Sequence, residues 1–145
     1  QITSGLPVLI PETYVPDLTV RLGLYRRVAD LHDRAEIDSF AAELVDRFGK
    51  LPPEVDNLLS VIGIKQLCRA AHVEKLEARP KGAGIGFHNN THPNPAGLVA
   101  YLSRQGAGMK LRPDHKLVAL RVWDNETTRL KGVIRVMKEL ADLAV

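Results

Sequence analysis

The sequence predicts an α+β fold, in which an N-terminal three-helix layer is followed by a small, mainly antiparallel four-stranded sheet with two further helices. Apolar residues recur at helical spacing through most of residues 18–71, as expected for helices that bury one side. The period then shortens to strand alternation within residues 73–123, where Gly and Pro mark the turns. A last helical pattern follows residue 125.

The composition is that of an ordinary globular domain. The chain has 145 residues, of which 45% are hydrophobic and 26% charged, enough for one domain with a core. No apolar run approaches the roughly 18 residues of a membrane span, so we expect a soluble protein. The start at Gln1, without a basic-then-apolar leader, favours a fragment or a processed chain. The single Cys68 excludes an internal disulfide and fits a reducing compartment.

The N-terminal segment, residues 1–16, contains the prolines Pro7, Pro11 and Pro16. Proline fixes φ and lacks an amide donor, so we expect an extended linker, an edge strand or a strap laid over the core. We therefore divide the chain into this segment and a single α+β domain over residues 17–145.

Three helices are predicted in the first half of the chain. The first, 18–31, follows Asp17, which is a suitable N-cap. The second, 34–48, carries an apolar stripe formed by Ile37, Phe40, Ala41, Leu44 and Phe48. The third, 53–71, is apolar on nearly all sides, which is typical of a central helix.

Between the second and third helices the sequence predicts a sharp structural corner, formed by Phe48, Gly49, Pro52 and Pro53. We expect Gly49 to end the second helix in the left-handed conformation. Pro52 prevents the helix from continuing, and Pro53 fits the first turn of the next one.

The second half is predicted to contain a β-hairpin, a short helix, a strand pair and a closing helix. The ranges are 73–79 and 83–88 for the hairpin, 95–104 for the short helix, and 109–111 and 116–123 for the strand pair. Either Asp124 or Asn125 caps the closing helix. In the last strand, one face is expected to pack: that of Val118, Leu120 and Val122, or that of Leu117, Arg121 and Trp123.

Two motifs that can carry chemistry are present only in part. The glycine-rich run Lys81 to Gly86 is followed by a strand pattern, whereas a phosphate-binding loop must lead into a helix, so we assign it to the hairpin. His88 and His92 have the i, i+4 spacing of zinc ligands but lie in a loop next to Pro93. We therefore predict no catalytic, metal or cofactor site in this chain.

Three carboxylates lie on the side of the second helix opposite its apolar stripe: Glu36, Glu43 and Asp46. Arg47 lies beside Glu43 as a partial neutraliser. Such residues commonly serve solubility. Alternatively, an acidic face in a net-basic domain meets a basic partner, and we take these four residues as a candidate partner interface.

Three motifs occur in the order and at the intervals of a known family. They are Leu9-Ile10-Pro11-Glu12-x-Tyr14-Val15-Pro16-Asp17, Arg21-Leu22-x-Leu24-Tyr25-Arg26-Arg27 and Glu43-Leu44-Val45-Asp46-Arg47-Phe48-Gly49-x-Leu51-Pro52. In these motifs the chain resembles the carboxy-terminal domain of the bacterial transcription-repair coupling factor family. The likeness covers nearly the whole chain, is densest before residue 70 and is looser after residue 80.

The resemblance implies a specific role. Proteins of that family are ATP-driven translocases on double-stranded DNA that displace stalled RNA polymerase and recruit the excision-repair protein UvrA. Their motor, with its ATP and Mg²⁺ sites, lies upstream of this domain, so this chain alone is not expected to be an enzyme. In the family the domain folds back on the amino-terminal UvrA-binding module and restrains the motor. The resemblance thus implies an autoinhibitory domain of a bacterial cytoplasmic protein, monomeric in isolation and without a membrane partner.

Two other classes of function stay open. The net charge of +3 alone is a weak argument for nucleic-acid binding. An auxiliary DNA-binding module would use Arg26, Arg27, Arg129, Lys131, Arg135 and Lys138. A self-associating domain would instead pair the exposed apolar residues of its extended N-terminal segment.

Overall fold

The computed structural model describes residues 2–3 and 7–145 of the chain. These residues form two compact units. We call residues 7–66 the helical unit; residues 67–145, together with the short strand β1 (Ile2–Thr3), form the sheet unit. The sequence suggested a division after residue 16 and a single domain beyond it, whereas the boundary between the compact units lies after residue 66.

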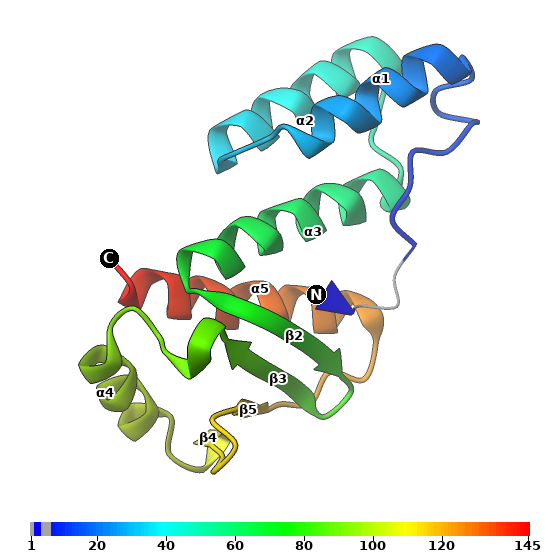
Figure 1. The fold of residues 1–145 in the computed structure, drawn as a ribbon. Helices are drawn as coiled ribbons and strands as arrows, with labels where there is room; N and C mark the ends of the chain where they lie inside the picture. Colours follow the sequence, from blue (N-terminus) through cyan, green and yellow to red (C-terminus); the bar gives the residue numbers. More distant parts are fainter. Residues whose placement is uncertain (1, 4–6) are drawn as a thin grey trace. The chain divides into compact units, whose positions relative to one another are not determined.

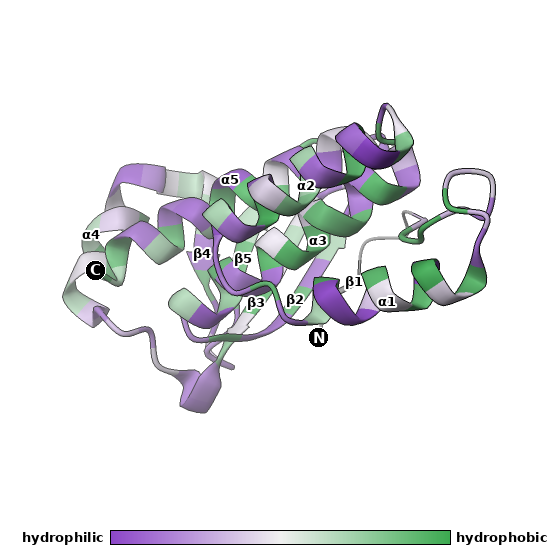
Figure 2. Ribbon diagram, turned by 90° about the horizontal axis from the view of Figure 1, so that it is seen from above, coloured by the Kyte–Doolittle hydropathy of each residue, from purple (hydrophilic) through white to green (hydrophobic). Residues whose placement is uncertain are grey.

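The helical unit is built from α1 (Leu18–Ala29), α2 (Arg34–Phe48) and the greater part of α3 (Pro53–Ala70). All three predicted ranges agree with the structure to within two residues. Asp17 caps α1 and Asp33 caps α2, each accepting a hydrogen bond from a backbone N–H of the first turn. Helices α1 and α2 lie side by side (Figure 1), and hydrophobic and hydrophilic residues alternate along them as in amphipathic helices (Figure 2).

The core of the helical unit contains apolar side chains from its helices and from the segment that precedes α1. They are Ile10, Val15, Leu24, Val28, Ile37, Phe40, Leu44, Val55 and Leu59. Ile10 and Val15, which are 2% and 1% exposed, belong to the proline-rich segment. The Ile10 N–H also donates a hydrogen bond of 2.7 Å to the hydroxyl of Tyr25 on α1. Ile10 and Val15 therefore anchor the described part of the proline-rich segment, residues 7–16, to this core.

In the described residues, the sheet has five strands in the order β1-β2-β3-β5-β4. The four longer strands are β2 (Val73–Arg79), β3 (Gly82–Phe87), β4 (Met109–Leu111) and β5 (Leu117–Leu120), and they pair antiparallel as predicted. The fifth, β1, pairs parallel with β2 at the edge of the sheet. The central strand is β3, because β2 and β5 pair with its two sides.

Two helices complete the sheet unit, α4 (Pro95–Gln105) and α5 (Glu126–Leu143). Asn94 caps α4 and Asn125 caps α5, which decides between the two predicted caps of the closing helix. Helix α5 passes behind β2 in Figure 1 and contacts it, so it lies on that face of the sheet. Within the described residues, the opposite face carries no helix of the sheet unit.

The strand β5 is shorter than the predicted range 116–123. It ends at Leu120, which pairs with Gly82, the first residue of its partner β3; beyond this point the N–H groups of Arg121 and Trp123 donate to carbonyl oxygens of the β2–β3 turn. Leu117 is fully buried and Trp123 is 5% exposed, whereas Leu120 is 49% exposed. The packed face is therefore that of Leu117 and Trp123.

Gly82 follows the hairpin turn in a backbone conformation that favours glycine, with φ at 134°. A Cβ atom at this position would overlap the carbonyl oxygen of Ala119 in the neighbouring strand. Gly84, two residues further along β3, has no such constraint, because its Cβ would meet only Lys116 Cδ at 3.6 Å. The glycine-rich run thus forms a hairpin strand, as predicted.

Replacing Gly82 should destabilise the sheet unit, and replacing Gly84 should not. Gly82→Ala is expected to lower the free energy of unfolding by more than about 1 kcal/mol, because the new methyl group meets backbone and φ is positive. Gly84→Ala should leave it unchanged or raise it by about 0.5 kcal/mol, because glycine is unfavourable within a strand. Urea unfolding followed by the fluorescence of Trp123 measures both, and equal decreases in the two variants would contradict this account of Gly82.

Candidate functional site

A groove of about 380 Å³ lies at the surface of the helical unit. Its lining residues come from α1, α2 and the loop between them: Arg27, Leu31, Asp33, Ala35, Glu36, Ser39, Phe40 and Glu43. Two of the three predicted interface carboxylates, Glu36 and Glu43, line this groove, whereas Asp46 and Arg47 do not. Glu43 shares the groove with Phe40, so it does not lie opposite the apolar stripe as the helical spacing suggested.

Glu43 is held by two guanidinium groups. Arg27 on α1 donates from Nη1 and Nη2 to the two carboxylate oxygens, at 2.6 and 2.7 Å. Arg47, one turn along α2, donates to Glu43 Oε2 at 3.1 Å. The guanidinium of Arg27 also lies 5.0 Å from the ring centroid of Phe40, and that of Arg47 lies 4.9 Å from the ring centroid of Phe48. Glu43 is therefore a neutralised carboxylate, and the helical spacing alone did not reveal its main partner.

The hydrogen bonds from Arg27 and Arg47 lower the pKa of Glu43 from 4.5 to about 2, because they stabilise the ionised carboxylate. The same interaction raises the pKa of Arg27. Both groups therefore stay charged over the whole physiological pH range.

The other two carboxylates of the trio differ from Glu43. Glu36 Oε1 accepts a hydrogen bond of 2.9 Å from the His32 N–H and so satisfies a backbone donor at the start of α2. Asp46 is exposed, and among the described residues it has no ion-pair or hydrogen-bond partner for its carboxylate. Asp46 is therefore the member of the trio with a carboxylate available to a partner.

The predicted corner is present, with one difference. Gly49 caps α2 with positive φ, but its dihedrals of 94° and −168° are not those of the left-handed helical conformation that we predicted. Its N–H donates to the Val45 carbonyl, and the chain leaves α2 in an extended direction open almost only to glycine. Pro52 precedes α3 and Pro53 begins it, as expected.

The corner is also tied to the segment before α1. The hydroxyl of Tyr14 lies 2.7 Å from the carbonyl oxygen of Gly49 and 3.1 Å from that of Leu44. The rings of Tyr14 and Phe48 have centroids 5.7 Å apart. The helical pattern by itself does not predict Tyr14 as part of the corner, although an amphipathic residue between prolines is a usable signal.

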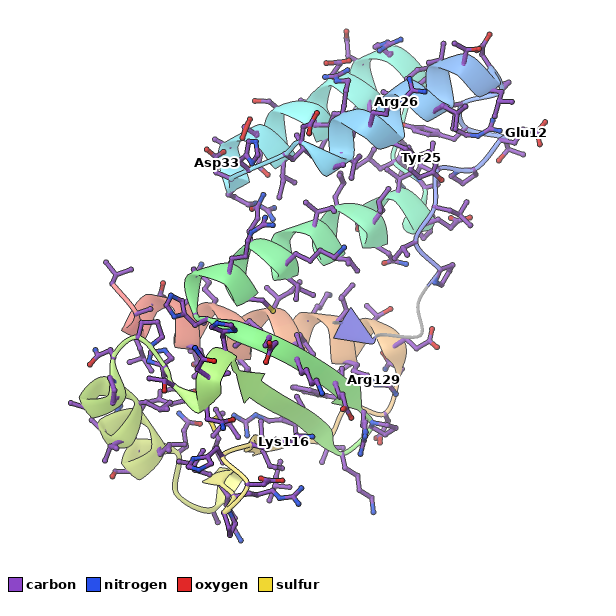
Figure 3. All side chains as sticks on the ribbon, viewed as in Figure 1. Glu12, Tyr25, Arg26, Asp33, Lys116 and Arg129 are labelled. Atoms are coloured by element: carbon purple, nitrogen blue, oxygen red, sulfur yellow. The ribbon has the colours of Figure 1, made fainter. Side chains whose placement is uncertain are left out.

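The six basic residues of the DNA-binding alternative lie in different units. Arg26 is exposed on α1 (Figure 3) and Arg27 is bound to Glu43, both in the helical unit. The other four lie on α5 of the sheet unit: Arg129, Lys131, Arg135 and Lys138. Lys131 and Arg135 line a hollow of about 460 Å³. The DNA-binding role of this set stays a prediction.

The two histidines with zinc-like spacing are used separately. His92 is 3% exposed, and its Nε2 lies 2.9 Å from the Leu140 carbonyl oxygen while its Nδ1 accepts from the Asn94 N–H. His88 is exposed and lies 3.5 Å from a carboxylate oxygen of Glu74. Among residues 2–3 and 7–145, no group of three or more His, Cys, Asp or Glu side chains is arranged to hold a metal ion.

The single cysteine is not prepared for chemistry. Burial raises the pKa of the Cys68 thiol to about 11, so the thiol stays protonated and weakly nucleophilic at neutral pH.

In the part of the chain that the structure describes, no helix has both the length and the apolar character needed to cross a membrane.

Comparison with known proteins gives the family. Residues 4–98 match the model of the TRCF domain, and the chain therefore belongs to the TRCF domain family. It is 40% identical over 120 residues to the transcription-repair-coupling factor of Rickettsia bellii, which covers 83% of this chain and 11% of that protein. It is 32% identical over 145 residues to the transcription-repair-coupling factor of Escherichia coli, covering 100% of this chain and 13% of that protein.

The chain thus spans about a tenth of the length of these relatives. Among solved structures, the fold is similar to the crystal structure of the C-terminal domain of transcription-repair coupling factor, with a TM-score of 0.81 and 19% identity. That match covers 99% of this chain and 92% of the other. The predicted fold class and the family resemblance are confirmed.

Removing Arg27 should raise the pKa of Glu43. In Arg27→Gln, the loss of the stronger guanidinium donor should move the pKa from about 2 toward 4.5. The stabilisation that ionised Glu43 provides is present above pH 4.5 and is lost as the pH falls toward 2. Carboxyl-carbon NMR titration measures the shift. Arg34→Gln is the matched control because Arg34 pairs with Asp38, and a Glu43 pKa that is the same in both variants would contradict the assignment.

Proposed function

We propose that this chain is the regulatory, autoinhibitory carboxy-terminal domain of a bacterial transcription-repair coupling factor. It docks on the amino-terminal UvrA-binding module of the same protein, masks that module and restrains the motor. Membership of the TRCF domain family and the fold shared with the C-terminal domain of such a factor support this proposal. ATP, Mg²⁺, double-stranded DNA, RNA polymerase and UvrA would be bound by the full-length cytoplasmic protein in transcription-coupled repair.

The observation that carries the docking proposal is the unequal state of the three α2 carboxylates, Glu36, Glu43 and Asp46. Asp46 is exposed and available, so it can pair directly with a basic side chain of the module. Glu43 already has two guanidinium donors, so a basic residue of the module would replace one of them. Glu36 is engaged at the start of α2 and contributes through its charge.

This arrangement suits a contact that must open again. Replacing one guanidinium by another at Glu43 changes the number of ion pairs little, so the net attraction comes chiefly from Asp46. Exposed charge pairs contribute modestly and are screened by salt. Charge complementarity of this kind sets orientation and partner choice more than raw affinity.

Charge reversal should release the docked state. In the full-length protein, Glu43→Arg combined with Asp46→Arg is expected to raise both UvrA binding and basal ATPase activity. Glu43→Arg also places three guanidinium groups together, which can disturb α1 and α2 locally. Asp46→Arg alone avoids this, and it should raise UvrA binding and ATPase activity by a smaller amount. Unchanged UvrA binding and ATPase activity in the double variant, with its circular dichroism spectrum retained, would refute the docking surface.

The matched control reverses Glu12 and Asp30, which are exposed carboxylates of the same helical unit that do not line the groove. Glu12→Arg with Asp30→Arg should leave both activities at the wild-type level. Binding of the 145-residue chain to the separately expressed amino-terminal module tests the proposal directly. That binding should weaken with Asp46→Arg and persist in the control.

A further inference from the structure

The face of the sheet opposite α5 is rich in basic side chains. Cross-strand pairing places residues on it, since directly paired residues point to the same side. The pairs Glu77↔Gly84, Gly84↔Val118 and Lys110↔Val118 form one such row. The basic sheet face, as we call it, comprises Lys75, Arg79, Lys81, Lys110, Arg112 and Lys116. Lys116, which precedes β5, is labelled in Figure 3.

Positive charge exceeds negative charge on this face. Its two carboxylates are Glu77, bound to Arg79 and 4.0 Å from Lys116 Nζ, and Asp114, which lies 3.4 Å from Arg112. Glu74 lies at the irregular end of β2, beside His88. Three of the six cations, Lys75, Lys81 and Lys110, form no ion pair with any described residue. Even when Glu74 is counted with them, six cations against three carboxylates leave a surplus of three positive charges, equal to the net charge of +3 of the whole chain, so the basic character of the chain is concentrated here.

A shallow hollow of about 210 Å³ lies at the centre of this face. Its floor is the backbone of β3 at Gly82 and Gly84, where there is no side chain, together with Val118 and Leu120 of β5. Basic side chains of the face stand around it. None of the residues that line it is aromatic. The hollow is thus an open, positively charged trough without a platform for base stacking.

We propose that the basic sheet face binds the sugar–phosphate backbone of nucleic acid, with duplex DNA as its ligand. The cations come from strands and turns on both sides of β3, so a continuous polyanion neutralises more of them than a single small anion does. Without an aromatic residue, binding is to phosphates and independent of sequence.

The geometry disfavours an acidic peptide as the occupant. Extended peptides bind sheets by adding a strand to a free edge, where backbone N–H and C=O groups are unpaired. The trough lies over β3, whose backbone is paired with β2 on one side and β5 on the other. Side-chain charge is therefore what this surface offers, and the surface is distinct from the groove of the helical unit.

The test measures binding of fluorescently labelled duplex DNA to the 145-residue chain by anisotropy across a salt series. The sheet variant carries Lys75→Gln, Lys81→Gln and Lys110→Gln, which removes three charges without breaking an ion pair within the described residues. The matched control carries Lys131→Gln, Arg135→Gln and Lys138→Gln on α5, the helix used by the DNA-binding alternative.

The sheet variant should weaken binding roughly fivefold or more, and the slope of log K against log salt should fall by about 0.9 for each phosphate that the variant no longer neutralises. The α5 control should bind like the wild type. Gly84→Val adds a side chain to the lining of the trough, where its Cβ would meet only Lys116 Cδ, at 3.6 Å; the variant should weaken binding while the melting temperature is retained. Gly23→Ala, in the helical unit with open space around it, is its control.

Several results would overturn the proposal. One is the absence of salt-dependent binding by the wild type. Others are binding that is weakened equally in the two triple variants, or only in the α5 variant. Unchanged binding by Gly84→Val would also contradict the proposal. Displacement of the DNA by poly-glutamate at equal charge concentration would assign the face to acidic polypeptides instead. The measurement does not involve the amino-terminal module, so its outcome is independent of the proposed docking.

Discussion

Ile37, Phe40 and Leu44 are buried along one side of α2, with exposed fractions of 2%, 2% and 0%. Their burial fixes the rotation of α2 about its axis and therefore decides where its charged residues lie. Glu43, next to Leu44 in sequence, is turned toward α1, where Arg27 reaches it. Asp46, one turn further, is left in solvent. The difference between a neutralised and an available carboxylate follows from this one packing contact.

In the sheet unit, the corresponding constraint is the close approach of β3 to β5. Gly82 allows this approach, because any side chain there would meet the Ala119 carbonyl. Once the two strands pair, the alternation of side chains sends Leu117 and Ala119 to the face that α5 covers and leaves Leu120 on the other. The basic side chains of β2 and β4 then join the open face through the same register.

Each unit therefore has a charged surface of its own, with a different chemistry. The helical unit presents a groove lined by the paired Glu43 and Arg27, while Arg47, the second donor to Glu43, and the available Asp46 lie outside its lining. The sheet unit presents a surplus of Lys and Arg around a trough. The proposed docking contact and the proposed contact with a polyanion use separate residues, so either interaction can be removed by mutation without the other.

The sequence by itself determined the helices, the hairpin and the fold class, because helix caps, apolar stripes and turn residues act over a few positions of the chain. It also determined the family, through motifs that are contiguous in sequence. It did not determine where β5 ends, since Arg121 and Trp123 bond to a turn some 40 residues away. It did predict Arg47 as a partner of Glu43, but not Arg27, the contact of Tyr14 with the Gly49 carbonyl, or the ψ angle of Gly49. Only the tertiary structure decided these, because each depends on which distant backbone or side-chain groups the packing brings within hydrogen-bonding distance.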